Sequence, residues 1–366
     1  MIIENADILN FKNIREASID FSEGVNCLLG RNGMGKSNLL EALHFVCMAR
    51  PMTSLPEGSL IRHGCDLMSV QARFRMDNDM DEKVNIGIVR GKGKSLKRNG
   101  KDYDRISSHI GRFPIVVAAP ADSELVRGAA QERRRMVDMV ISQAHPSYLS
   151  QLMRYNRSLE NRNNMLRAGV KDVLLYESVE SVMDDAAAVV YDHRRRWVEE
   201  MKGPVSANYA EIAGGVETLE ISYHSVLNER GMQEVLDANR SRDVALGYTS
   251  AGIHRDDVVA TLDGFPIKAY GSQGQVKSYT VALRLAIFDY LRNAGKETPL
   301  LLLDDIFDKP DAERVGRIMQ LVSHRDSFGQ IFITDTNREH LDETLAGLTG
   351  PKKLIVVEDG TFETLR

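Results

Sequence analysis

The chain has 366 residues, 43% of them hydrophobic and 27% charged, so it can form two domains or one large domain with an insertion. The formal net charge of −5 gives no global attraction to nucleic acid or to an anionic membrane, and a DNA site would have to be a local patch. Three cysteines without a Cys-x-x-Cys pair argue against a metal cluster or a disulfide framework.

The N-terminal part, residues 1–120, shows short apolar runs broken by glycine and polar turns, which predicts an α/β region with a helix after Lys36. Alternating strands between Phe74 and Lys101 should be joined by a hairpin at the Gly/Lys-rich residues 90–94. The start of the chain lacks a signal-peptide pattern, and no stretch approaches the ~20 apolar residues that cross a bilayer. We therefore expect a cytoplasmic protein with no membrane partner.

A phosphate-binding loop is predicted directly after a short apolar strand at residues 25–29. The loop reads Gly30-Arg31-Asn32-Gly33-Met34-Gly35-Lys36-Ser37 and fits the Walker A pattern G-x-x-x-x-G-K-[ST]. Its backbone N–H groups can surround phosphate oxygens, Lys36 can reach the β- and γ-phosphates, and Ser37 can offer its hydroxyl to Mg²⁺. We therefore expect ATP and Mg²⁺ as cofactors. The alternative, an ordinary glycine-rich turn, is disfavoured by the strand before the loop and the helix after it.

Residues 121–215 are predicted to form a helical arm, because glycine and β-branched residues become rare and apolar residues recur at spacings of three and four. One apolar stripe consists of Tyr148, Leu152, Tyr155, Leu159 and Leu166. A second stripe runs from Val179 to Val190. Two or more long helices should therefore pack together in this region.

The arm is also rich in arginine, and such charges usually form a solvated face. The alternative is phosphate binding on DNA. The candidates for that role are Arg133, Arg134, Arg154, Arg157, Arg194 and Arg195. The first two also lie where an ion pair with Asp138 would shape the arm. If the arm does not bind DNA, the remaining candidate is the basic hairpin with Lys92, Lys94, Lys97 and Arg98.

The α/β pattern returns in residues 216–366. The apolar run from Leu300 to Leu303 predicts a central parallel strand, and such strands deliver functional groups at their carboxyl ends, here Asp304 and Asp305. Asp304 should hold Mg²⁺, largely through water, and Asp305 should orient or polarise the attacking water. The alternative is a pair of helix-capping residues. This pair and the Walker A loop lie near opposite ends of the chain, so the fold must bring them together.

A third element, Gly271-Ser272-Gln273-Gly274-Gln275, precedes an amphipathic helix. Taken alone, such a Ser/Gly/Gln cluster is most often a helix N-cap.

The order of these elements, with a helical insertion between them, resembles an ABC-type ATPase head of the SMC class. The match is most specific to the RecF family of DNA replication and repair proteins at Gly252-Ile253-His254-Arg255-Asp256-Asp257 and at the cluster from Gly271 to Gln275. Further matching residues are Asn10 to Asn13, Asn38 after the Walker A loop, Arg133-Arg134 with Asp138, and Asp311. The resemblance implies an α/β ABC-type head assembled from residues 1–120 and 216–366, with the helical arm as an inserted domain.

The resemblance also implies roles that spacing does not assign. The signature loop, Ser272, Gln273, Gly274 and Gln275, would contact the γ-phosphate of ATP on the opposite subunit, and Asn38 would join the nucleotide site. RecF-like proteins bind ATP and either double-stranded DNA or duplex/single-strand junctions, and they form ATP-dependent homodimers. They hydrolyse ATP slowly, act with RecO and RecR in loading RecA at gaps, and are linked to the SOS response.

The chain departs from the family pattern at four places, which leaves the activation of water open. Ile253 replaces a usual proline, Val276-Lys277 replaces Gln-Arg, and Asp308 replaces a serine in the stretch Asp308 to Asp311. Thr334-Asp335-Thr336 supplies no switch histidine. We expect His254 to belong to a hydrogen-bonded turn rather than to catalysis.

Three other functions share some of these sequence features. A transporter nucleotide-binding subunit would carry a switch histidine and no helical insertion. A chromosome-condensing SMC protein would need hundreds of heptad residues. A nucleotide-gated scaffold with negligible turnover remains open beside a weak ATPase.

Overall fold

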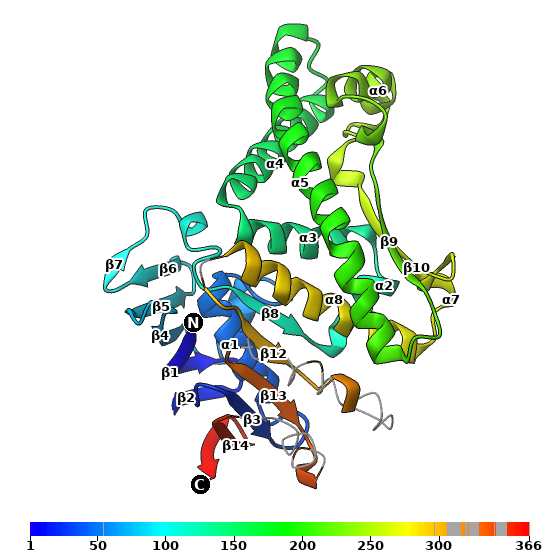
Figure 1. Cartoon of the computed structure of the whole chain (residues 1–366). Helices are drawn as coiled ribbons and strands as arrows, with labels where there is room; N and C mark the ends of the chain where they lie inside the picture. Colours follow the sequence, from blue (N-terminus) through cyan, green and yellow to red (C-terminus); the bar gives the residue numbers. More distant parts are fainter. Residues whose placement is uncertain are drawn as a thin grey trace. The chain divides into compact units, whose positions relative to one another are not determined.

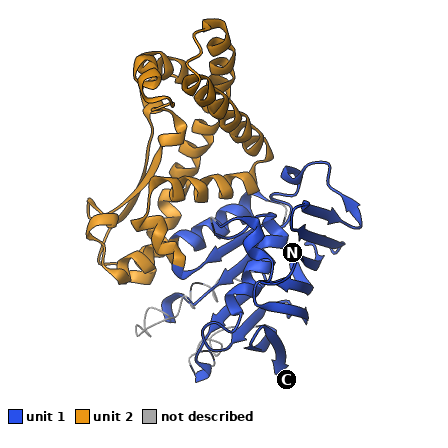
Figure 2. Cartoon of the chain, turned by 180° about the vertical axis from the view of Figure 1, so that it is seen from behind, with its two compact units in different colours: residues 1–120, 283–366 blue, residues 121–282 orange. Residues whose placement is uncertain are grey.

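The computed structural model describes residues 1–53, 55–295, 297–305, 316–318, 321, 329–339, 341 and 350–365. These residues form two compact units, which Figure 2 shows in different colours. Unit 1 combines Met1–Pro120 with Leu283–Arg366, and unit 2 is Ala121–Ala282. One unit is therefore built from both ends of the chain, and the other is inserted between them.

Unit 1 contains a six-stranded sheet in the order β15-β14-β3-β13-β12-β8 (Figure 1). Its strands are β3 (Val25–Leu29), β8 (Ile115–Ala118), β12 (Leu300–Leu303), β13 (Ile331–Asp335), β14 (Lys352–Glu358) and β15 (Thr361–Leu365). Five of these run parallel, and β15 pairs antiparallel with β14. Strands β12 and β13 are buried along their whole length, as expected for apolar parallel strands covered on both faces. The expected strands at 25–29 and 300–303 are confirmed.

The second sheet of unit 1 is antiparallel, in the order β2-β1-β4-β5-β6-β7. Its strands are β1 (Ile2–Phe11), β2 (Ile14–Asp20), β4 (Leu67–Arg75), β5 (Asp81–Val89), β6 (Gly93–Arg98) and β7 (Lys101–Asp102). The expected hairpin joins β5 to β6, and Gly91 adopts the φ of 77° that its tight turn requires. Helix α1 (Lys36–Met48) contacts strands of both sheets and is buried on nearly every face, so it forms the centre of this unit.

Unit 2 is mainly helical. Its helices are α2 (Ser123–Arg127), α3 (Ala130–Ala144), α4 (Pro146–Arg167), α5 (Val173–Ala213), α6 (Met232–Leu246) and α7 (Ile267–Tyr270), followed by the start of α8 (Gln273–Ala294). Helices α4 and α5 pack side by side (Figure 1). Tyr148, Tyr155 and Leu166 of one expected stripe and Met183 and Val190 of the other are buried. The predicted pair of long packed helices is therefore confirmed.

Unit 2 also contains a small antiparallel sheet in the order β11-β10-β9, formed by β9 (Leu219–His224), β10 (Asp257–Leu262) and β11 (Phe265–Pro266). Strand β9 packs along α5, and β10 contacts α3. These contacts place residues 216–282 in the same compact unit as the helices. The inserted unit is therefore longer than the expected helical arm, which ended at residue 215.

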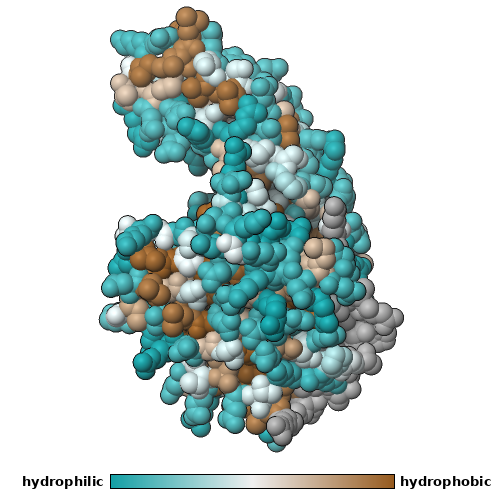
Figure 3. Space-filling view, turned by 90° about the vertical axis from the view of Figure 1, so that its left-hand side faces the viewer, coloured by the Kyte–Doolittle hydropathy of each residue, from teal (hydrophilic) through white to brown (hydrophobic). Residues whose placement is uncertain are grey.

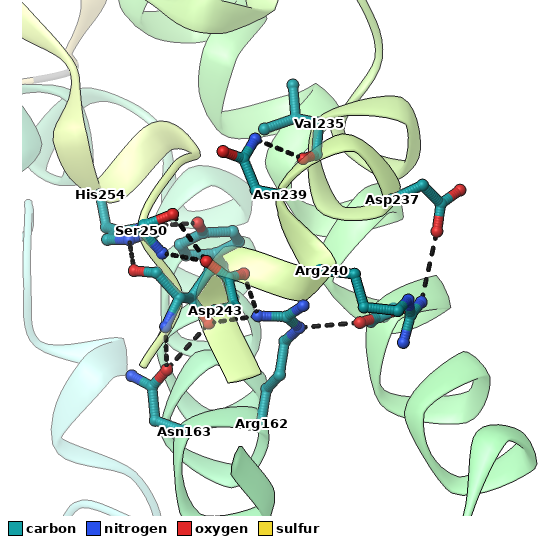
Figure 4. A network of polar contacts seen from close by, with 12 residues as sticks. Arg162, Asn163, Val235, Asp237, Asn239, Arg240, Asp243, Ser250 and His254 are labelled. Atoms are coloured by element: carbon teal, nitrogen blue, oxygen red, sulfur yellow. Dashed lines mark hydrogen bonds and ion pairs between the residues drawn. The ribbon is translucent and has the colours of Figure 1, made fainter. Parts of the chain in front are cut away.

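A buried polar network joins α4, α5, α6 and the loop after α6 (Figure 4). The Arg162 guanidinium is fully buried and donates to Glu180 Oε1 at 2.8 Å, Asp243 Oδ2 at 2.7 Å and Thr249 Oγ1 at 2.8 Å. Arg240 donates to the other Glu180 oxygen at 2.6 Å. Removing one member of such a buried ion-pair network leaves an uncompensated charge and costs about 3–5 kcal/mol. Some arginines of the arm therefore form buried ion pairs inside it and are not part of its surface.

The end of unit 2 where α4 passes into α5 carries a group of apolar side chains (Figure 3). Val173, Leu174 and Leu175 are 61%, 75% and 46% exposed, so the exposed apolar surface of α5 is concentrated in its first turn. Within the described part of the chain, no helix combines the length and apolar character that a membrane crossing requires.

Candidate functional site

The Walker A loop connects the buried strand β3 to the N-terminus of α1, as the motif predicts. Gly33 and Gly35 adopt φ values of 82° and 116°, which let the backbone turn tightly before the helix. The Lys36 ammonium donates to the carbonyls of Gly30 and Arg31 at 2.6 and 3.1 Å. The loop is therefore held by the same charge that would reach a bound phosphate.

Two further segments hold the loop from outside the motif. Asn13 Nδ2 donates to the Met34 carbonyl at 3.1 Å, and Asn13 Oδ1 accepts from Asn38 Nδ2 at 2.7 Å. The Gly360 N–H, in the turn between β14 and β15, donates to the same Met34 carbonyl at 2.8 Å. These contacts give Asn38 a structural role in the loop. Asn13 and Gly360 therefore also hold the loop, and the sequence alone did not predict that either residue lies beside it.

Asp304 lies beside the Walker A loop, as predicted from the sequence. Ser37 Oγ donates to Asp304 Oδ1 at 2.9 Å across 267 residues of sequence. The reason is strand order, because β13 pairs in parallel with both β3 and β12 and so aligns their carboxyl ends. Burial raises the pKa of Asp304, while hydrogen bonds from Ser37 and Thr334 oppose the shift. A buried carboxylate beside a serine hydroxyl is an oxygen donor set that fits Mg²⁺, which would favour the ionised form.

Asp305 is held in the left-handed region, with φ of 44°. Its N–H donates to Thr334 Oγ1 at 2.8 Å, and the Thr334 hydroxyl in turn donates to Asp304 Oδ1 at 2.9 Å. One hydroxyl thus fixes both acidic residues relative to each other. The sequence predicted no role for Thr334, which belongs to the stretch that lacks a switch histidine. The available signal was a polar residue at the carboxyl end of an apolar strand.

Asp335 follows Thr334 and is buried, and its Oδ1 accepts from the Asn337 N–H at 2.8 Å. Its backbone carbonyl accepts from the N–H of Gly30 at 3.2 Å, so β13 also contacts the first residue of the Walker A loop. The stretch from Asp308 to Asp311 lies outside the described residues.

The signature loop lies in unit 2 and caps α8. The Gln275 N–H donates to Ser272 Oγ at 3.2 Å, and the Ser272 N–H donates to Gln275 Oε1 at 2.6 Å. This reciprocal pair is a capping box, with Gln273 and Gly274 in the first turn between its two members. The expected N-cap is therefore present. Because Ser272 Oγ accepts this bond and the residue is exposed, its hydroxyl proton remains able to donate to a ligand.

The proposed DNA-contacting arginines divide into two groups. Arg194 is only 3% exposed and forms a bidentate ion pair with Asp138 at 2.9 and 3.0 Å, so the expectation that it contacts DNA is corrected. Arg133 forms a bidentate pair with Asp257 at 2.7 and 2.9 Å, and Arg134 donates to the Asp256 carbonyl at 2.5 Å. Asp138 therefore pairs with Arg194, and not with Arg133 or Arg134 as the sequence suggested.

The other arginines, Arg154, Arg157 and Arg195, are exposed on α4 and α5. Arg154 donates to Gln151 at 3.0 Å and Arg195 to Asp192 at 3.2 Å, both within one helical turn. Such exposed local contacts are weak and leave the guanidinium available to a phosphate. In the basic hairpin, by contrast, Lys94 is tied to the Ala49 carbonyl at 2.7 Å and to Glu57.

His254 is part of a hydrogen-bonded turn, as expected. Its Nε2 lies 3.0 Å from the Thr249 carbonyl, which can only accept, so Nε2 carries the proton and Nδ1 accepts from the Tyr155 hydroxyl at 2.7 Å. Burial lowers the pKa of His254 to about 4, which keeps the ring neutral. Two acidic residues of the same motif also make structural contacts, because Asp256 and Asp257 bind arginines of α5 and α3.

Comparison with known proteins extends over nearly the whole chain. Residues 2–355 match the RecF/RecN/SMC N terminal domain family. The chain is 43% identical over 361 residues to the DNA replication and repair protein RecF of Porphyromonas gingivalis, covering 98% of this chain and 99% of the relative. It is 42% identical over 365 residues to that of Parabacteroides distasonis, covering 100% of both.

Solved structures show the same fold. One, described as the recombination mediator protein RecF-ATP in the RecFOR pathway, is 26% identical, with a TM-score of 0.88, and covers 100% of this chain and 97% of that chain. An Smc head domain from Pyrococcus furiosus is 19% identical, with a TM-score of 0.58, and covers 99% and 95%. The expected ABC-type head of the SMC class is thereby confirmed.

Proposed function

This chain belongs to the RecF family of DNA replication and repair proteins, and on that premise we propose that it is an ATP-driven switch that dimerises on DNA. The observation that carries the proposal is the hydrogen bond between Ser37 and Asp304, which joins the Walker A loop to the acidic end of β12. These two residues would hold Mg²⁺, with Lys36 on the β- and γ-phosphates of ATP. The bound metal would neutralise charge on the phosphates.

ATP would then bring two copies together. The exposed hydroxyl of Ser272 and the N-terminus of α8 offer donors to the γ-phosphate held by the other copy, while the Walker A loop of each copy holds its own nucleotide. Slow hydrolysis, with Asp305 orienting the water, would release the dimer. The Asp305 backbone N–H donates to Thr334 Oγ1 at 2.8 Å, and the half-buried Asp305 carboxylate accepts from the same hydroxyl at 3.3 Å, which supports this role.

The dimer would bind double-stranded DNA or duplex/single-strand junctions and help RecO and RecR to load RecA at gaps, with a link to the SOS response. Support for these partners comes from family membership and from the solved RecF structure described in the RecFOR pathway. On the protein surface, the exposed Arg154, Arg157 and Arg195 are the candidate phosphate contacts.

One experiment tests the switch. Sedimentation velocity with ATP, a non-hydrolysable analogue or ADP, each with and without duplex DNA, should give a dimer only with the two triphosphates and a larger complex when DNA is added. A chain that stays monomeric in ATP would contradict the proposal.

The second candidate is a nucleotide-gated scaffold with negligible turnover, which the absence of a switch histidine at Thr334-Asp335-Thr336 favours. Single-turnover hydrolysis of ATP, measured with and without DNA, separates the two. A dimer that forms with ATP but shows no hydrolysis above the Asp305→Asn variant would establish the scaffold.

A further inference from the structure

The signature loop is held by a residue outside every motif described so far. Glu217 lies in the connection between α5 and β9, and its carboxylate accepts a hydrogen bond from Gln275 Nε2 and another from the Tyr209 hydroxyl at 2.5 Å. Tyr209 is fully buried in the last turns of α5. The side chains of Gln275, Glu217 and Tyr209 thus form a continuous chain from the signature loop to the arm helix.

This contact decides how Gln275 is oriented. Its Oε1 must face the Ser272 N–H, because a rotated amide would set two N–H groups against each other. The Glu217 carboxylate can only accept when ionised, so it selects the same orientation from the other side. Glu217 therefore stabilises the capping box that positions the Ser272 hydroxyl. A second contact, from Asn208 Nδ2 to the Ala282 carbonyl at 3.2 Å, also fastens α5 to the first turns of α8.

Helix α5 and strand β9 are also joined at their other end, through hydrogen bonds to Asp256. Arg194 of α5 donates to Asp256 Oδ2 at 3.3 Å and to the Ile253 carbonyl at 2.7 Å, and Tyr223 of β9 donates to the same Asp256 oxygen. At the rise of an α-helix, Arg194 lies about 22 Å from Tyr209 along α5. Glu217 precedes β9 by two residues, and the six residues from Glu217 to Tyr223 can span up to about 20 Å when extended. The two elements therefore match in length and are tied at both ends.

We propose that Glu217 is a positioning residue of the signature loop, and that it couples the helical arm to the γ-phosphate contact in the partner copy. The proposal rests on the ATP-dependent dimer proposed above. A displacement of α5 by a ligand on the arm reaches the signature through Tyr209 and Glu217, because a packed helix and strand fixed at both ends move together. The chemistry is a hydrogen-bond relay and requires no further cofactor.

The central test is a double-mutant cycle between Glu217 and Gln275. Gln275→Glu sets two carboxylates against each other and should weaken ATP-dependent dimerisation by about tenfold or more, since hydrogen bonds to charged groups have effects of this size. When Glu217→Gln is added, position 217 carries an amide and position 275 a carboxylate, so a hydrogen bond between the two side chains can form again. The dimerisation constant should then return to within about threefold of wild type. The matched control is Glu220→Gln, at an exposed position of β9, which should change the constant by less than about twofold.

A second variant separates positioning from coupling. Tyr209→Phe removes only the hydroxyl that joins Glu217 to α5, so dimerisation in ATP alone should stay within about threefold of wild type. The further stimulation of dimerisation by duplex DNA should fall by more than this factor, although the Asn208 contact to the Ala282 carbonyl remains. A merely structural tyrosine would lower both quantities together. ATP binding to the monomer should be unchanged in every variant, because the Walker A loop belongs to unit 1.

Hydrogen exchange in the nucleotide-free monomer tests the relay without the dimer. Peptides spanning residues 272–276 should exchange about tenfold faster in Glu217→Ala than in wild type or Glu220→Gln. Unchanged exchange, or a Gln275→Glu defect that Glu217→Gln does not relieve, would overturn the role of Glu217 even if the wild type dimerises. A wild type that remains monomeric in ATP would overturn the coupling together with the proposed function.

Discussion

Lys36 shows at the scale of one residue how the loop is prepared for a ligand. The Lys36 ammonium donates hydrogen bonds to the Gly30 and Arg31 carbonyls of its own loop, which hold the side chain in place. A phosphate can therefore be met by a side chain that is already in place. Little ordering of the lysine should be needed on binding, which favours affinity.

We predict that Lys36→Met lowers ATP affinity by about tenfold or more and abolishes ATP-dependent dimerisation, because the hydrogen bonds from a charged donor to phosphate are removed. Isothermal titration and sedimentation measure the two effects. The control is Lys92→Met, in the exposed hairpin of unit 1. Dimerisation of a folded Lys36→Met chain at the wild-type ATP concentration would show that the lysine has been assigned wrongly.

Asp305→Asn should keep nucleotide and metal binding but slow hydrolysis, so that the ATP dimer persists longer. Asparagine tolerates the left-handed φ of 44°, and its N–H can still donate to Thr334, so the local fold should survive. The amide cannot supply the carboxylate charge near the attacking water. Single-turnover kinetics provide the measurement. Unchanged turnover would transfer the role elsewhere, with Asp335 next to be tested.

Three histidines inside the fold predict how stability depends on pH. Burial lowers the pKa of His44 to about 3 and of His109 and His254 to about 4, below the ordinary value near 6.5. The unfolded chain then binds more protons than the folded one between about pH 6.5 and 4, so stability falls as pH is lowered through that window. For His254 the loss of stability approaches about 3 kcal/mol.

Thermal unfolding at pH 7.5, 6.0 and 5.0 measures this dependence. His254→Gln removes one titrating ring and should flatten the decline, although it also lowers stability at neutral pH by breaking the bond to Tyr155. The matched control is His63→Gln, at an exposed position. A midpoint that is constant between pH 7.5 and 5.0 would contradict the prediction.

At the scale of elements, the signature loop is both a helix cap and the proposed contact for the partner's γ-phosphate. We predict that Ser272→Arg leaves ATP affinity of the monomer nearly normal and blocks dimerisation, because the long side chain would collide with the γ-phosphate site of the other copy. Losing the cap would cost about 1 kcal/mol of stability. Ser272→Asp separates the two roles, since aspartate caps as well as serine but repels phosphate. A marked fall in monomer affinity would instead place Ser272 beside the nucleotide of its own copy.

The elements that local sequence patterns predicted are those whose signals are local. The Walker A loop combines a strand, a glycine pattern and a helix start, and β12 is a continuous apolar run, so both were identified with correct bounds. Thr334 and Gly360 reach the site only because β13 and β14 pair with β3. Pairing order between distant strands is set by the packing of the whole sheet, which no single window of sequence contains.

The arginines of the arm illustrate the same limit. Composition could not distinguish Arg194, which is buried against Asp138, from Arg195, which is exposed one position further along α5. Neighbouring residues on a helix point about 100° apart, so the distinction depends on which face packs against α3 and α4. Helical spacing predicted the apolar stripes, but it did not reveal that acidic partners lie opposite the same face.

For the whole molecule, the net charge of −5 makes DNA binding dependent on a local surface. We predict that Arg154→Ala, Arg157→Ala and Arg195→Ala, combined in one chain, weaken duplex binding and lower the salt slope by about 0.9 for each phosphate that is no longer neutralised. Fluorescence anisotropy at several salt concentrations, with ATP in the Asp305→Asn background, measures both. Arg194→Ala is unsuitable as a test, since it should destabilise the fold.

The matched comparison is Lys92→Ala with Lys97→Ala in the basic hairpin of unit 1. If neutralising the arm leaves affinity and slope unchanged while the hairpin change lowers both, the DNA surface lies on unit 1. The effect of either change should be nearly independent of DNA sequence, as expected of backbone contacts.

The position of β3 between β13 and β14 has a consequence for biosynthesis. While the chain emerges from a ribosome, the Walker A loop and β3 are made early, but both neighbouring strands come from residues 331–358 and are made last. Until then β3 has two unpaired edges, and a nascent chain in this state invites chaperone binding or aggregation. A product interrupted before β14 would carry the Walker A sequence but lack the strand and turn that hold its loop. Premature termination should therefore yield chains without nucleotide affinity.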